Sequence, residues 1–127
     1  MSHLSRLFKA LADPNRLRIV NILSENALCV CDLQSVLNLS QPFVSRHLAY
    51  LRNLGVVRDR RDGPRVCYSL ALEGQLGLAL RSFLGEALPL SPNLRADLDR
   101  LDELAKAGSL KSRAFEPDWD ELSSRAA

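Results

Sequence analysis

The N-terminal half of the chain spaces its hydrophobic residues as amphipathic helices do. Four of them recur at i, i+3, i+4 and i+7, which is one face of a helix: Leu4, Leu7, Phe8 and Leu11. Asp13 followed by Pro14 is typical of a helix start, because aspartate caps the first turn and proline fits the first helical position. The pattern predicts one helix over 4–11 and a second from 14 to about 23.

Two further helices are predicted, with a three-residue turn between them. The first covers 30–37, and the second begins after Ser40 and stops before Gly55, a residue suited to the position that follows a helix. Each has an apolar face, made of Leu33, Val36 and Leu37 in the first and of Val44, Leu48 and Leu51 in the second. Two short helices joined in this way are typical of a helix-turn-helix.

A β-hairpin follows the second of these helices. The runs 56–61 and 65–70 alternate polar and apolar residues around Asp62-Gly63-Pro64, which is a turn sequence. Another helix is expected over 76–87, before Pro89, and a last one after Ser91-Pro92. The last helix carries a narrow apolar seam, the kind that packs on a partner helix: Leu94, Leu98, Leu101 and Ala105.

This order of elements predicts a mainly α fold with a small β-hairpin, a winged helix-turn-helix. We assign residues 1–107 to one DNA-binding and dimerisation domain and 108–127 to a polar C-terminal tail, in which Phe115 and Trp119 are isolated. The seam of the last helix and the stripe of the first are left over once one small core is filled. The fold is therefore expected to dimerise through its terminal helices, with two-fold symmetry.

Charge is unevenly distributed along the 127 residues. Lys and Arg outnumber Asp and Glu by ten to five in residues 1–68, and are outnumbered seven to ten in 69–127, which together give the net charge of +2. Fourteen of the 17 cations are Arg, which suits forked contacts with phosphate and guanine. No apolar run approaches the roughly 18 residues of a membrane span, and a signal-peptide core is absent. We therefore expect a cytoplasmic protein that binds a polyanion rather than a membrane.

The second helix of the helix-turn-helix and the hairpin carry the candidate DNA contacts. Gln41 and Ser45 are expected to contact base edges in the major groove, and Arg46 a guanine or a phosphate. Four cations crowd the hairpin and are expected to contact flanking phosphates: Arg58, Arg60, Arg61 and Arg65. The alternative is an ordinary solvated surface without a nucleic-acid partner.

Four segments in the predicted order resemble the ArsR/SmtB family of bacterial metal- and metalloid-responsive repressors. They are ADPNRLRI at 12–19, LCVCDL at 28–33, SQPFVSRHL at 40–48 and LRNLGVV at 51–57. The resemblance covers roughly residues 4–105. It implies a homodimeric repressor that binds double-stranded operator DNA and leaves it when an inducer binds. It implies no permanent cofactor.

Cys29 and Cys31 are the candidate inducer ligands. If both lay in a regular helix, their side chains would point about 200° apart at 3.6 residues per turn, so they would bind one ion only where the first turn unwinds. Such unwinding would disturb the helix that supports the DNA-reading helix, and this is the predicted mechanism of release. The alternative for Cys29 is a small buried hydrophobe.

The resemblance implies the identity of the inducer. Members that respond to arsenite and antimonite have Cys-Val-Cys-Asp-Leu at this place, usually followed by a third cysteine where this chain has Gln34. Cys67 is a candidate third ligand, although the alternation of Val66, Tyr68 and Leu70 predicts that it points outward; a small-molecule thiol or water is the alternative. Residues 75–107 contain no histidine, which excludes the family's histidine–carboxylate zinc site.

The three cysteines are compatible with two other functions. The first is a repressor of the same fold whose thiols sense oxidants or persulfides, although a Cys-x-Cys pair in a helix has diverging side chains and forms a disulfide poorly. The second is a thiol enzyme such as a reductase. The sequence has no Cys-x-x-Cys motif and no strand-rich α/β pattern, so we predict that the protein is not an enzyme.

Overall fold

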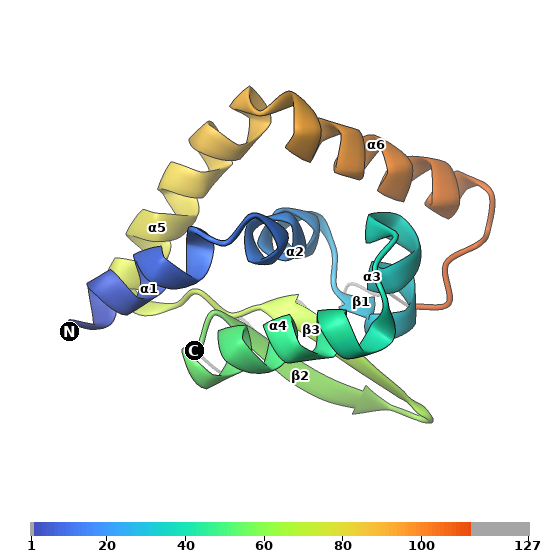
Figure 1. The fold of residues 1–127 in the computed structure, drawn as a ribbon, viewed down its shortest axis with the longest axis horizontal. Helices are drawn as coiled ribbons and strands as arrows, with labels where there is room; N and C mark the ends of the chain where they lie inside the picture. Colours follow the sequence, from blue (N-terminus) through green and yellow to red (C-terminus); the bar gives the residue numbers. More distant parts are fainter. Residues whose placement is uncertain (1, 113–127) are drawn as a thin grey trace.

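The helix over residues 14–25 is central (Figure 1). The helices over 74–87 and 92–106 lie on one side of it, and the helix-turn-helix and its hairpin lie on the other. The computed structural model describes residues 2–112. Its elements, in chain order, are α1 (His3–Leu11), α2 (Pro14–Glu25), β1 (Leu28–Cys29), α3 (Val30–Leu37), α4 (Gln41–Asn53), β2 (Val57–Asp62), β3 (Arg65–Leu70), α5 (Gly74–Ala87), the 3-10 turn η1 (Leu88–Leu90) and α6 (Pro92–Lys106). The predicted winged helix-turn-helix, mainly α with a small hairpin, is confirmed.

Local signals explain where the helices begin and end. The Asp13 carboxylate accepts the backbone N–H groups of Asn15 and Arg16 at 2.9 and 3.0 Å, so it caps α2 as predicted. α3 ends at Asn38, whose φ of 56° places it in the left-handed region. Asparagine tolerates this conformation better than most residues, and it makes possible the tight turn between α3 and α4.

The hairpin is one part of a three-stranded antiparallel sheet with the order β1-β3-β2. β2 and β3 pair from Val57↔Leu70 to Asp62↔Arg65, which confirms the predicted hairpin. The first strand covers 57–62 rather than the predicted 56–61, because Asp62 pairs with Arg65 and leaves only Gly63 and Pro64 in the turn. β1 was not predicted, because two residues are too few to show a period. It pairs with the far edge of β3, with Leu28 opposite Tyr68 and Cys29 opposite Cys67. β3 is therefore the central strand and has neighbours on both edges.

The core joins α2 to the helix-turn-helix. Its largest fully buried side chains include Ile19 and Ile22 of α2, Leu33 and Leu37 of α3, and Leu48 and Leu51 of α4. α3 packs on α4 and on α6. A displacement of α3 is therefore transmitted directly to α4.

α6 contradicts the prediction that its apolar seam is left for a partner. Leu94 and Leu101 are buried within the chain, because α6 packs against α2 and α3. Arg18 of α2 donates to the Asp97 carboxylate at 2.8 and 3.0 Å and adds a polar anchor. Apart from Tyr50 on α4, the large exposed hydrophobic side chains of the described residues lie instead on α1, α5 and η1, and include Phe8, Phe83 and Leu90.

Candidate functional site

The two thiols at the start of α3 are close together. Cys29 is the N-cap of α3 and has an extended backbone, with φ −74° and ψ 161°, whereas Cys31 lies in the first turn. Their sulfur atoms are 2.7 Å apart. Cys29 precedes the helix, in agreement with the predicted limits 30–37, so the divergence of about 200° expected for two thiols within one regular helix does not apply to this pair. α3 need not unwind to bring the two sulfurs onto one atom.

Asp32 lies beside the thiols and holds the segment that follows α6. Its side chain is buried, and its carboxylate forms with the two sulfurs a cluster of donor atoms within 4.8 Å of one another. It accepts the backbone N–H groups of Lys111 and Ser112 at 2.8 and 2.6 Å, and the Ser112 hydroxyl. The Ser112 Oγ in turn accepts the Cys29 N–H at 2.7 Å. The first residues of the predicted tail therefore lie against the thiol pair, while Phe115 and Trp119 fall outside the described residues.

Sequence reasoning missed these contacts for a physical reason. Asp32 and Ser112 are 80 residues apart, and a hydrogen bond between a carboxylate and a loop leaves no periodic trace. The only signal was an aspartate in an otherwise apolar stretch. A buried carboxylate needs several donors.

Burial keeps the Cys29 thiol protonated. Its side chain is 1% exposed, and loss of solvation, followed by the hydrogen bond with Cys31, raises the pKa of Cys29 to about 12. Sulfur ligands favour soft ions over hard ones such as magnesium or calcium. A ligand for this pair must therefore be thiophilic and must remove a proton that Cys29 holds firmly.

Cys67 is buried, whereas the hairpin alternation had predicted that it points outward. It lies directly opposite Cys29 in the sheet. The alternation could not indicate this, because β1, the strand that brings Cys29 beside Cys67, is too short to show a period. Among the described residues, the cluster within 4.8 Å comprises Cys29, Cys31 and Asp32, so the Cys67 sulfur stands outside it.

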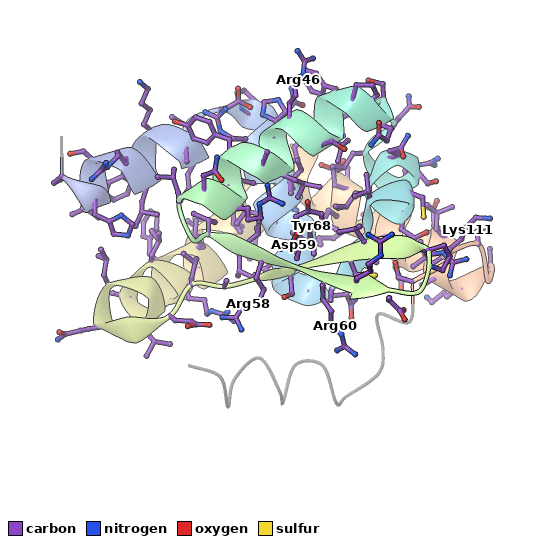
Figure 2. The ribbon with its side chains drawn as sticks, turned by 90° about the horizontal axis from the view of Figure 1, so that it is seen from below. Arg46, Arg58, Asp59, Arg60, Tyr68 and Lys111 are labelled. Atoms are coloured by element: carbon purple, nitrogen blue, oxygen red, sulfur yellow. The ribbon has the colours of Figure 1, made fainter. Side chains whose placement is uncertain are left out.

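The exposed face of α4 carries the three predicted DNA-contacting residues of that helix. Gln41 Nε2 donates to Ser45 Oγ at 2.8 Å, which links the two predicted base readers. Arg46 is exposed, with its guanidinium 5.9 Å from the Phe43 ring, and it points away from the hairpin (Figure 2). The His47 ring packs edge-on against Phe43, with the ring centres 4.7 Å apart.

The predicted cations of the hairpin are not equivalent. Arg58 is half-buried in an ion pair with Glu73 at the start of α5. Arg60, Arg61 and Arg65 are exposed. Arg58 and Arg60 lie on the side of the hairpin away from Arg46, whereas Asp59 lies toward α4 (Figure 2), where it pairs with Arg52 at 3.1 Å. Arg58 therefore has an intramolecular role, and the exposed cations gather from the middle to the tip of the hairpin.

Comparison with known proteins agrees with this architecture. Residues 13–59 match the model of the bacterial regulatory protein, arsR family, and those residues run from the cap of α2 to the start of the hairpin. The fold is shared with HlyU of Vibrio cholerae N16961 in its reduced form: the TM-score is 0.59, the identity 37%, and the match covers 66% of this chain and 86% of that one. The chain belongs to the arsR family.

Other arsR-family relatives add detail. The arsenical resistance operon repressor of Escherichia coli K12 is 55% identical over 67 residues, which are 52% of this chain and 57% of that repressor. The chain therefore matches little more than half the length of this relative. The homodimeric winged helix-turn-helix domain of Mb0332 from Mycobacterium bovis has a TM-score of 0.58 at 28% identity, covering 65% of this chain and 75% of that one.

Membership of the arsR family confirms the resemblance noted from the sequence and groups the chain with regulatory proteins rather than enzymes. Within residues 2–112 no helix is both long enough and apolar enough to cross a membrane. The individual DNA contacts and thiol ligands remain predictions.

Proposed function

We propose that this protein is a homodimeric, cytoplasmic transcriptional repressor that leaves its operator when trivalent arsenic or antimony binds to Cys29 and Cys31. The observation that carries the proposal is the 2.7 Å separation of the two sulfurs at the start of the helix that supports α4. The similarity to an arsenical resistance operon repressor supports the choice of inducer.

The DNA contacts follow from the helix-turn-helix. α4 is the recognition helix, with Gln41 and Ser45 toward base edges near its N-terminus and Arg46 toward a guanine or a phosphate. Arg60, Arg61 and Arg65 of the hairpin bind flanking phosphates. Arg58 stabilises the base of the hairpin through Glu73 and contributes less to the DNA contacts than was predicted.

The protonation of Cys29 favours a metalloid over a divalent metal. Arsenite in neutral water is mainly arsenous acid, which exchanges its hydroxyl groups for thiols: each S–H proton leaves with a hydroxyl as water, and no net proton is released. A divalent cation releases free protons when it binds thiols. Because the pKa of Cys29 is raised to about 12, this release is unfavourable at neutral pH and becomes easier as the pH rises.

The test is operator binding by the purified protein, with arsenite, antimonite, cadmium, zinc and peroxide added separately at pH 6 and pH 8. We expect arsenite and antimonite to release the DNA at similar concentrations at both pH values. Cadmium should need less metal at pH 8, by about tenfold per pH unit for each proton displaced. Fluorescence anisotropy of labelled operator DNA measures the release.

The same measurement can also contradict the proposed function. Arsenite that leaves the operator bound at both pH values contradicts the proposal. Release by peroxide, reversed by a thiol reductant, supports the alternative of a redox- or persulfide-sensing repressor. The close approach of the two sulfurs is the observation that favours this second function.

A groove between α1, the start of α2, α5 and α6 supports the homodimer. Its volume is about 630 Å³, and it is lined mainly by apolar side chains, among them Phe8, Leu11 and Phe83. Phe8 and Phe83 are 51% and 56% exposed in the single chain. Exposed apolar residues that line one groove are typical of an interaction surface, and the resemblance to a homodimeric domain makes a second copy the partner that we propose.

Phe83→Asp is therefore expected to convert the dimer into monomers at micromolar concentration, since it buries a charge at the interface without a partner. Sedimentation equilibrium measures the mass. Leu78→Asp is the matched control, because Leu78 is equally exposed on α5 but lies outside the groove, and it should stay dimeric. A monomeric unaltered protein, or a dimeric Phe83→Asp variant, contradicts this interface.

A further inference from the structure

A row of three side chains crosses the sheet from the thiol pair to the hairpin. Cys29 of β1 lies opposite Cys67 of β3, and Cys67 lies opposite Arg60 of β2. Residues directly opposite each other in antiparallel strands share one face, with Cβ atoms about 4.5–5.5 Å apart. Cys67 therefore stands between a candidate inducer ligand and a candidate DNA contact.

The surroundings of Cys67 connect it to the thiol cluster. Its side chain is 3% exposed. Burial raises its pKa, and the nearby charges of Asp62, Asp32 and Cys31 raise it further, so its sulfur lies within electrostatic range of the cluster. Because the Cys67 sulfur stands outside the 4.8 Å group, Cys67 must move toward the cluster to reach an atom held by Cys29 and Cys31.

We propose that Cys67 is the third thiolate of the inducer site, so that the site takes a trivalent metalloid through three sulfurs. This inference rests on the proposed function. In the reaction with arsenous acid, three S–H bonds and three As–O bonds break, three As–S bonds form, and three waters leave. Arsenic stays trivalent, so neither an oxidant nor a reductant is needed.

Asp32 is a poor candidate for the third position. Its oxygens are hard donors, which suit magnesium or calcium better than a thiophilic atom. They already accept two backbone N–H groups and the Ser112 hydroxyl. Gln34, where related repressors have a cysteine, offers only an amide. Cys67 is the one remaining cysteine of the chain.

A three-sulfur site ties the inducer to the hairpin. The bound atom links the start of α3 to β3, the strand whose backbone pairs with β2 along the whole hairpin. A shift of Cys67 toward the cluster moves the residue directly opposite it, Arg60. Inducer binding therefore reaches a DNA-contacting strand without any unwinding of α3.

Two arsenicals of different valence test the proposal. Arsenite offers three exchangeable positions, whereas phenylarsine oxide offers two because a phenyl group occupies the third. In the unaltered chain, we expect arsenite to block three thiols and phenylarsine oxide two, counted with a thiol reagent after removal of excess ligand. Cys67→Ser should lower the affinity for arsenite by at least about tenfold, or 1.4 kcal/mol, and leave the affinity for phenylarsine oxide within about threefold.

The outcomes separate this inference from the function on which it rests. If the unaltered chain binds neither arsenical, the proposed function itself is wrong. If arsenite blocks only two thiols, or if Cys67→Ser leaves arsenite binding intact, Cys67 is not a ligand although the proposed function stands. An equal loss of affinity for both arsenicals in Cys67→Ser also overturns the inference. Cys67→Ala serves as a second variant, and we expect it to lose affinity for arsenite but not for phenylarsine oxide. Cys31→Ser is the control that loses both.

Discussion

Cys29→Ser and Cys31→Ser should each keep the protein on its operator at arsenite concentrations that release the unaltered chain. A shift from 99% bound to 99% free requires the inducer to favour the released state by about 10⁴-fold, or roughly 5.5 kcal/mol. Several sulfur–arsenic bonds supply such a difference in free energy. Without the Cys29 or the Cys31 thiol, too few sulfur–arsenic bonds remain to supply it. Anisotropy of labelled operator DNA, titrated with arsenite, measures the response.

Both serine variants should bind the operator when no inducer is present, since neither thiol faces DNA. Ser35→Ala is the matched control: Ser35 lies on α3 and donates to the Cys31 carbonyl, but it offers no sulfur, so its variant should release normally. A normal response to arsenite in both cysteine variants would refute the metalloid sensor and leave only the DNA-binding half of the proposal.

The anchors of α3 suggest how binding at its start reaches the DNA. At its C-terminal end, the Leu37 carbonyl accepts from Arg18, which also pairs with Asp97 of α6. At its N-terminal end, Asp32 holds Lys111 and Ser112 after α6. A ligand on the two sulfurs lies beside the N-terminal anchor formed by Asp32, so it shifts α3 as a rigid helix. This replaces the predicted unwinding of the helix.

The fold was predictable from the sequence wherever a local pattern decided the structure. The limits of α3 are those predicted, because three apolar residues and a tight turn determine them, and Asp13-Pro14 indicated the start of α2. The hairpin followed from alternation on both sides of Gly63, whose φ of 60° suits a residue without a side chain. Each of these features is determined by a few residues that are neighbours in the sequence.

The site was less predictable because its geometry depends on distant partners. The sulfurs meet because Cys29 belongs to a two-residue strand, and that strand exists only through its pairing with β3, some 40 residues later. The same pairing places Cys67 opposite Cys29. The return of residues 111–112 to Asp32 likewise requires α6 to cross α2 and α3. A helical wheel, which considers one element at a time, contains none of this information.

Replacement of Arg60 and Arg61 together by alanine should weaken binding to any DNA sequence and flatten its salt dependence. Each lost phosphate contact lowers the slope of log affinity against log salt by about 0.9, so a change of about 1.8 is expected for two contacts. Both side chains are exposed on β2, and phosphate contacts carry no sequence information. Operator and unrelated DNA should therefore lose affinity alike, when each is titrated across a series of salt concentrations.

The matched control removes two positive charges from another part of the molecule. Arg95 and Lys106 are exposed on α6, which lies on the opposite side of α2 from α4 and the hairpin (Figure 1). Their double alanine variant changes the net charge equally, so it should alter only the long-range attraction and leave the slope nearly unchanged. An unaltered slope in the Arg60/Arg61 variant would mean that the hairpin does not touch the DNA backbone. An equal change in both variants would mean that net charge, rather than direct contact, sets the salt dependence.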